Sequence, residues 1–128
     1  LKIDTVKAMP KSFAARILVG GGQVAMKKIP EIKPIDKDLS VYDEIFIATP
    51  IWNSQGVPAI NAFLMDEGIC RKVTGLIITS GGGDIDKCVR VLEEKVPNVK
   101  YKVSLLDRKH KDYGFNCEKI NEFVEKIG

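Results

Sequence analysis

Residues 41–52, VYDEIFIATPIW, decide the fold class of this chain. Two acidic residues lead into a short apolar run at residues 45–48, which is typical of a strand buried in a parallel sheet. Pro50 is predicted to stop this strand, and Trp52 opens a loop. Ligands of open α/β sheets bind beyond the carboxyl ends of the strands. Residues 49–56 are therefore the first candidates for a binding loop.

The rest of the chain alternates predicted helices and strands. Apolar residues recur every three or four positions in the predicted helices and run together in the predicted strands. The expected elements are a helix over residues 57–68, a strand over 73–79, a helix over 84–96, a strand over 99–106 and a helix over 116–127. Asp84 and Asn116 are suited to cap the helices that they begin. This alternation predicts an α/β fold of three layers, an open parallel sheet with helices on both faces.

Two segments of the chain carry motifs of a known family. The residues of the first are Asp43, Ile45, Ile47, Thr49, Pro50, Ile51, Trp52, Pro58, Ala59, Ile60, Phe63 and Leu64. The second is VTGLIITSGGG at residues 73–83. They resemble the third and fourth strands and the two flavin loops of the flavodoxin family, and residues 21–34 resemble a segment found before the third strand in a subgroup. The resemblance covers nearly the whole chain and implies a flavodoxin-like fold.

The resemblance also implies a site for the isoalloxazine ring of FMN between two loops. The residues expected to bind the cofactor are Thr49, Pro50, Ile51, Trp52, Asn53, Ser54, Gln55, Thr79, Ser80, Gly81, Gly82 and Gly83. An indole against a flavin combines apolar area with stacking, and a glycine loop offers N–H groups without obstructing a planar ring. The structural alternatives are that Trp52 closes the top of the sheet and that the glycines form a plain loop.

The family's first strand, phosphate-binding loop and first helix have no counterpart in this sequence. Proteins of the family wrap the FMN phosphate with N–H groups at a helix N-terminus. Residues 1–7 alternate like a half-exposed strand and correspond to the family's second strand. The glycines at residues 20–22 lack the strand and helix context of a phosphate cradle. We therefore expect residues 1–128 to form one flavodoxin-like domain that is incomplete at its N-terminal end.

An empty first-strand position would leave unpaired N–H and C=O groups on the strand at residues 45–49. Such an edge is costly in a marginally stable domain. Residues 1–7 are therefore expected to move in beside residues 45–49 or to pair with another chain, for instance in a homodimer that covers the vacant position. Ile47 and Ile77 are expected to be central and buried.

Composition excludes several classes of function. The 128 residues are 45% hydrophobic and 29% charged, with a formal net charge of +3, which is ordinary for a globular protein. The basic residues are scattered among acids, so nucleic-acid binding is not expected. No apolar run has the length of a membrane span, so a membrane partner is not expected. The cytoplasm is the expected compartment.

The reactive side chains form no recognisable catalytic or metal motif. Cys70, Cys88 and Cys117 lack metal-ligand spacing and are expected to be reduced thiols. Cys88 lies on the apolar side of its predicted helix and is expected in the core. His110 is the sole histidine and is expected in an exposed loop. Hydrolytic and metal chemistry are therefore not predicted.

The leading hypothesis is an FMN-dependent electron-transfer protein that works with a redox partner protein or a small-molecule acceptor. The enzymatic alternative is an NAD(P)H-dependent flavin or quinone reductase of similar fold, so the sequence leaves open whether the chain is an enzyme. The third hypothesis is a scaffold of this fold that binds no flavin. Because phosphate contacts contribute much to FMN affinity, FMN binding is expected to be weak or absent without the phosphate loop.

Overall fold

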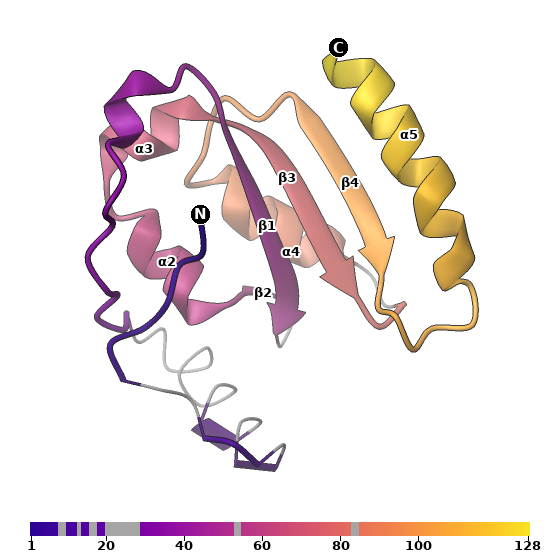
Figure 1. The fold of residues 1–128 in the computed structure, drawn as a ribbon, viewed down its shortest axis with the longest axis horizontal. Coiled ribbons are helices and arrows are strands. Elements are labelled where there is room, and N and C mark those ends of the chain that lie inside the picture. The colour runs from indigo at the N-terminus through magenta and orange to yellow at the C-terminus, as the bar shows by residue number, and fades with distance from the viewer. Residues whose placement is uncertain (8–9, 13, 16–17, 20–28, 53–54, 83–84) are drawn as a thin grey trace.

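The computed structural model describes the chain except for residues 8–9, 13, 16–17, 20–28, 53–54 and 83–84. Its centre is a sheet with the strand order β2-β1-β3-β4 (Figure 1). The strands are β1 (Ile45–Trp52), β2 (Gln55–Gly56), β3 (Val73–Ser80) and β4 (Tyr101–Leu106). The strands β1, β3 and β4 are parallel, and the short β2 is antiparallel to β1. The predicted α/β class with an open sheet is confirmed, although β2 makes the sheet mixed.

Strand β1 is longer than the sequence predicts, because Pro50 does not end it. The strand continues through Pro50, and its last residues then pair with β2 as Ile51↔Gly56 and Trp52↔Gln55. A proline has no N–H for a sheet neighbour, and it is tolerated in a strand at the edge of a sheet. Pro50 therefore fits a strand that is paired on one side only at this position.

The helical segments that the structure describes are η1 (Leu39–Val41), α2 (Pro58–Phe63), α3 (Glu67–Lys72), α4 (Asp86–Glu93), η2 (Tyr113–Phe115) and α5 (Asn116–Ile127). Pro58 lies in the first turn of α2, where a missing N–H costs nothing. The carboxylate of Asp66 accepts a hydrogen bond from the N–H of Ile69 at 3.1 Å and caps α3. The helix predicted over residues 57–68 is therefore two helices, because Asp66 starts a new one.

The start of α5 is held differently from the prediction. Asn116 does not act as its N-cap. The Asn116 side chain accepts a hydrogen bond from the N–H of Leu106 at 2.8 Å and donates one to the Leu106 carbonyl at 2.9 Å. This side chain therefore fastens the start of α5 to the end of β4. Asp84, the predicted cap of α4, lies outside the described residues.

One face of the sheet carries the hydrophobic core. Helices α2, α3 and α4 cover this face, and alternate residues of β1 and β3 point toward them. The buried cluster consists of Ile47, Ile60, Phe63, Leu64, Cys70, Val73, Leu76, Ile78, Cys88, Val89, Leu92 and Val96. The expectation that Cys88 is a core residue is confirmed. Each fully buried aliphatic side chain contributes roughly 1.5–3 kcal/mol, so this face supplies most of the apolar burial.

The opposite face is covered by α5 among the described elements. Phe123 of α5 meets the ring of Phe46 edge-on, and Phe46 stacks on Tyr101 with ring centroids 6.1 Å apart. Gly75 of β3 lies beneath Phe46, and a Cβ at this position would collide with the ring. The missing side chain of Gly75 therefore lets an aromatic ring lie flat on the sheet beside α5.

In the part of the chain that the structure describes, this second face is open beyond α5. Ala48 and Pro50 of β1 are exposed, and Ile77 of β3 is only partly buried. The expectation that both central isoleucines are buried is correct for Ile47, which is 3% exposed, and wrong for Ile77. The two side chains point to opposite faces of the sheet, and only the face of Ile47 is fully covered by helices.

Residues 1–7 do not join the sheet. Thr5 forms an isolated antiparallel bridge with Ile32, supported by neighbouring backbone hydrogen bonds of 2.8 and 2.9 Å. The expectation that residues 1–7 pair beside residues 45–49 is wrong, because in the described part of the chain these residues of β1 pair with β3 alone, and β2 meets the other edge only at Ile51 and Trp52. Pairing with another chain stays a prediction.

Candidate functional site

A pocket opens where β1, β3 and β4 end, at the carboxyl edge of the sheet. Its volume is about 590 Å³, within the range of ~300–1,000 Å³ typical of small-molecule sites. The lining residues are Pro50, Ile51, Trp52, Thr79, Ser80, Gly81, Leu105, Leu106, Asp107, Arg108, Tyr113, Gly114, Asn116, Cys117 and Ile120. The two loops that the sequence singled out therefore meet in one cavity.

Backbone hydrogen bonds hold the ends of β3 and β4 together beneath this pocket. The last pair of the two strands is Ser80↔Leu106. The N–H of Asp107 then donates to the carbonyl of Ser80 at 2.7 Å. The Ser80 hydroxyl accepts a hydrogen bond from the N–H of Gly82 at 3.3 Å, which turns the chain directly after β3. The relative position of the two loops is therefore set by the sheet itself.

Gly81 and Gly82 have different roles in the loop after β3. A Cβ placed on Gly81 would meet no atom within 4 Å, so the space beside this residue is open. Gly82 has a φ of 101°, in the region that favours glycine. A Cβ on Gly82 would also lie 2.6 Å from Nε2 of His110. Gly81 thus leaves room for a ligand, whereas Gly82 makes the turn.

His110 lies in the loop after β4, as predicted, but its side chain is partly buried rather than exposed. Its side chain is 24% exposed, because the ring packs against Gly82. The ring atom Nδ1 accepts a hydrogen bond from the N–H of Asp112 at 3.1 Å, and a neutral ring bonded in this way carries its proton on Nε2. His110 therefore supports the loop after β3 from the loop after β4.

Six of the predicted cofactor residues line the pocket, namely Pro50, Ile51, Trp52, Thr79, Ser80 and Gly81. Thr49 lies on the core face of β1 and is 2% exposed. Its hydroxyl donates to the carbonyl of Pro50 at 3.0 Å and accepts from the N–H of Val57 at 3.4 Å. Thr49 thus positions the start of α2, because its side chain points away from the pocket.

The remaining predicted residues lie beside the pocket or outside the described chain. Gln55 of β2 pairs with Trp52 of β1 and does not line the cavity. Gly82 does not line it either, because this residue turns the chain toward His110. Asn53, Ser54 and Gly83 lie outside the described residues, as do the glycines at residues 20–22. The cofactor contacts predicted for them stay predictions.

The wall that β4 and α5 contribute to the pocket was not predicted from the sequence. Leu106, Asp107 and Arg108 lie at the carboxyl end of a third parallel strand, so the rule that pointed to the first two loops also pointed here. Cys117 is an exposed free thiol in this wall, and Tyr113 also lines the pocket. Asp107 and Arg108 are both exposed and place one charge of each sign at the rim.

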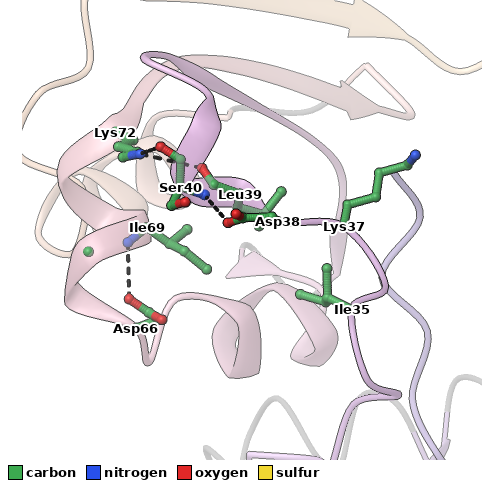
Figure 2. Close-up of a pocket in the computed structure, with 9 residues that line it drawn as sticks. Ile35, Lys37, Asp38, Leu39, Ser40, Asp66, Ile69 and Lys72 are labelled. Carbon is green, nitrogen blue, oxygen red and sulfur yellow. Dashed lines mark hydrogen bonds between the residues drawn. The ribbon is translucent and has the colours of Figure 1, made fainter.

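A second cavity, of about 430 Å³, lies between η1 and α3 (Figure 2). Asp38 accepts a hydrogen bond from the N–H of Ser40 at 2.9 Å, and hydrogen bonding to Ser40 lowers the pKa of the Asp38 carboxyl. The ammonium of Lys72 donates to the carbonyls of Ser40 at 2.6 Å and Leu39 at 3.4 Å. These charged groups therefore serve the local fold, and we assign no ligand to this cavity.

The part of the chain that the structure describes shows neither of two other kinds of functional feature. No cluster of at least three His, Cys, Asp or Glu side chains is arranged there to hold a metal ion. None of its helices is both long and apolar enough to cross a membrane. The pocket at the ends of β1, β3 and β4 is the candidate site because both predicted loops line it.

Comparison with known proteins places this fold in a family. A flavodoxin family model matches residues 23–127. No curated protein matches the chain at a significant level. Among solved structures, a flavoprotein of Lactobacillus acidophilus NCFM in complex with FMN is 17% identical with a TM-score of 0.64, and the match covers 95% of this chain and 77% of that one.

Two Bacteroides proteins have the same fold. The protein from B. eggerthii DSM 20697 is 21% identical with a TM-score of 0.62, over 94% of this chain and 78% of its own. The protein from B. uniformis ATCC 8492 is 23% identical with a TM-score of 0.65, over 91% of this chain and 79% of its own. Identities this low show the fold alone. The family model, however, spans most of the sequence, and the chain therefore belongs to the flavodoxin family.

Proposed function

We propose that this chain binds the isoalloxazine ring of FMN in the pocket at the ends of β1, β3 and β4, and that it serves in electron transfer with a redox partner. The main observation behind the proposal is that Trp52 and Gly81 line the same cavity of about 590 Å³. An indole wall and an open glycine suit a flat, largely apolar ring. Membership of the flavodoxin family, and the FMN complex of the similar L. acidophilus flavoprotein, support it.

Different walls of the pocket provide different kinds of contact for such a ring. Ile51, Trp52 and Leu105 supply apolar area, whereas Thr79 and Ser80 bring hydroxyl and backbone groups to the end of β3. Apolar walls with few polar groups are typical of small-molecule sites. Bound FMN would supply one-electron and two-electron redox chemistry, and the chain would orient the ring and exclude water from it.

The phosphate of FMN has no comparable cradle among the described residues. Arg108 is the single cation among the residues that line the pocket, and it is exposed. Water screens an exposed charge, so one such contact contributes little, typically about 0–1 kcal/mol. We therefore expect ring contacts to dominate the binding free energy and the chain to discriminate little between FMN and riboflavin.

Fluorescence titration tests the proposal, because Trp52 is the sole tryptophan and lines the pocket. FMN and riboflavin should quench it with similar dissociation constants, on the order of 10 μM to 1 mM, or ~4–7 kcal/mol of binding free energy. No quenching by either ligand would favour the scaffold hypothesis. A strong preference for FMN would reveal a phosphate site, with residues 20–22 as the first place to look.

A pair of variants locates the quenching. Gly81→Leu should abolish it, because the open space beside Gly81 lets the new side chain fill the pocket without disturbing the fold. Glu94→Leu adds the same side chain to an exposed position after α4 and should titrate like the parent chain. Equal quenching in both variants would place the flavin elsewhere.

Anaerobic reduction separates electron transfer from the reductase alternative. With flavin loaded, NADPH should leave the flavin absorbance unchanged, whereas dithionite should bleach it and an added acceptor protein should restore it. Rapid bleaching by NADPH would favour a reductase.

A further inference from the structure

The loop between β4 and α5 carries a cluster of cations at the mouth of the candidate site. Residues 107–115 are termed the basic loop. Its three basic residues, Arg108, Lys109 and Lys111, are all exposed. In the part of the chain that the structure describes, their side chains form no hydrogen bond or ion pair. The two lysines around the start of β4, by contrast, are each paired with a glutamate, at 3.5 and 2.7 Å. The cations of the basic loop are therefore available to a partner.

The two acidic residues of the basic loop lie against the loop itself. The Oδ1 atom of Asp107 accepts a hydrogen bond from the N–H of Lys109 at 3.2 Å. Asp112 is partly buried, and its Oδ2 atom lies 3.9 Å from Nδ1 of His110. The groups that the basic loop offers to a partner without breaking its own contacts are therefore its cations.

Backbone hydrogen bonds give the basic loop a defined shape. The N–H groups of His110, Tyr113 and Phe115 each donate to the carbonyl three residues earlier, at 2.8, 3.0 and 3.1 Å. Three successive turns of this kind follow one another without a gap. The ring of His110 also packs against Gly82 in the loop after β3. A surface that is already ordered loses little conformational entropy when a partner binds.

Two aromatic side chains accompany the cations. Tyr113 is 45% exposed and Phe115 is 60% exposed. Tyr113 and Arg108 also line the candidate flavin pocket. Aromatic residues and arginine are enriched in protein interfaces, whereas lysine belongs to the polar rim. In Figure 1 the chain between β4 and α5 passes beyond the arrowheads of β3 and β4. A protein seated on the basic loop would therefore stand at the mouth of the pocket.

We propose that the basic loop is the docking surface for an acidic redox protein, one whose contact surface carries Asp and Glu side chains around its own redox centre. This inference rests on the proposed function, because the electrons come from flavin bound in the pocket. Lys109 and Lys111 steer the partner, and opposite charges of this kind raise association rates by about 10–10³. The rings of Tyr113 and Phe115 supply the apolar contact at the centre of the interface.

Nucleic acid suits this surface less well. Binding to nucleic acid is dominated by phosphate contacts, and continuous basic patches or stripes mark the proteins that make them. The basic loop has three cations, and carboxylates stand at residues 107 and 112 on either side of them. It also borders the pocket where we propose that the flavin binds. An acidic electron carrier accounts for both the charge and the position.

The test compares two electron acceptors that carry the same haem. One is cytochrome c, and the other is cytochrome c whose lysines have been succinylated, which makes its surface acidic. A stoichiometric amount of dithionite reduces the flavin-loaded chain in the absence of oxygen. Each reduced flavin then passes one electron to each of two ferric haems, which become ferrous, and releases its protons to the buffer. Free reduced flavin, measured in parallel, gives the background rate.

Salt dependence separates steering from contact. At about 10 mM salt, where the screening length is ~30 Å, the chain should reduce the succinylated protein roughly tenfold or more faster than native cytochrome c. At about 1 M salt, where the screening length is ~3 Å, this preference should vanish. Phe115→Ala should slow the reaction at every salt concentration without changing its salt dependence, because it removes a contact and no charge.

Charge reversal at two pairs of residues locates the surface. The double variant Lys109→Glu/Lys111→Glu should lower the low-salt rate with the succinylated protein roughly tenfold or more. It should leave the quenching of Trp52 by flavin unchanged, because neither lysine lines the pocket. The matched control is Lys33→Glu/Lys37→Glu, which makes the same change of charge at two exposed residues before η1. This control should react like the parent chain.

A measurement without flavin separates this inference from the proposed function. In the ¹⁵N-labelled chain, the amide signals of residues 108–115 should shift when succinylated cytochrome c is added, and native cytochrome c should leave them in place. If the chain binds no flavin, the proposed function fails while these shifts still decide the docking surface. The inference is overturned if the shifts fall elsewhere or are absent, or if Lys109→Glu/Lys111→Glu behaves like the parent chain. Tighter binding of a single-stranded oligonucleotide than of the succinylated protein would overturn it as well.

Discussion

Two adjacent isoleucines of β3 test whether the two faces of the sheet differ as the structure shows. Ile78 belongs to the buried cluster and is 1% exposed. Ile77 points to the α5 face and is only partly buried. The two residues share a strand, a side-chain type and nearly the same backbone environment. Alanine at each position therefore compares the two faces directly.

The expected loss of stability follows from what each side chain contacts. Replacing isoleucine by alanine removes three carbon atoms, at ~0.8 kcal/mol each, or about 2.4 kcal/mol of transfer free energy. At Ile78 the rigid surroundings add a cavity term, so Ile78→Ala should lower the free energy of unfolding by ~2–5 kcal/mol. At Ile77 water can enter the vacated space and part of the side chain is already wet, so we expect a loss of roughly 1–2 kcal/mol.

Urea unfolding followed by far-ultraviolet circular dichroism measures both losses. The slope of the free energy with urea should match that of the parent chain, so that a shift in midpoint reports stability alone. Ile78→Val is a graded control and should cost ~0.5–1.5 kcal/mol. The reasoning is refuted if Ile77→Ala costs as much as Ile78→Ala, because the α5 face would then be covered as fully as the core face.

Four further predictions concern single side chains. Thr74 is 5% exposed, and its hydroxyl has no hydrogen-bond partner among the described residues. Thr74→Val should therefore raise the free energy of unfolding by about 1 kcal/mol. A fall in the urea midpoint would mean that the hydroxyl has a partner. Asn116→Ala leaves the N–H and carbonyl of Leu106 without their partners and should lower the free energy of unfolding by ~2 kcal/mol, whereas an unchanged midpoint would argue against the clamp between β4 and α5. Cys117 is exposed in the pocket wall, whereas burial raises the pKa of the Cys88 thiol. A thiol reagent should therefore label Cys117 before Cys88. Riboflavin bound in the pocket should slow the labelling of Cys117. Above about pH 9.0, the usual thiol pKa, the unfolded chain releases the Cys88 proton before the folded chain does, so stability should decline with rising pH and Cys88→Ala should flatten the decline.

The strands β1 and β3 and their loops were predictable because their signals are local. A short apolar run followed by a turn predicts a buried strand, whatever the position of that strand in the sheet. The rule that ligands bind beyond the carboxyl ends of strands then pointed to Trp52 and Gly81, and both line the pocket. The same rule applied to Asp107 and Arg108 after β4. No motif marks that loop in the sequence, so nothing local singled it out.

Other features depend on contacts between residues distant in the sequence. The sequence around Asn116 is typical of a helix cap, but the Asn116 side chain forms its hydrogen bonds with the backbone of Leu106. His110 is in a loop, as its sequence context predicts, but the turn at Gly82 brings the two loops together and partly buries its ring. Thr49 belongs to the predicted binding loop, but the alternation of side chains along β1 points it into the core. Such outcomes require the positions of neighbouring elements.

The sequence by itself determined the α/β class, the family and the loops that form two sides of the pocket, because apolar periodicity and turn chemistry act over a few residues. Only the tertiary structure decided which residues share that pocket, since β4 and α5 supply a wall that no local pattern marks. It also showed that residues 1–7 leave the edge of β1 free, and that the face carrying Ile77 and Ala48 is half covered. Burial depends on what lies across the sheet, and an apolar strand has the same local pattern whether or not a partner covers its edge.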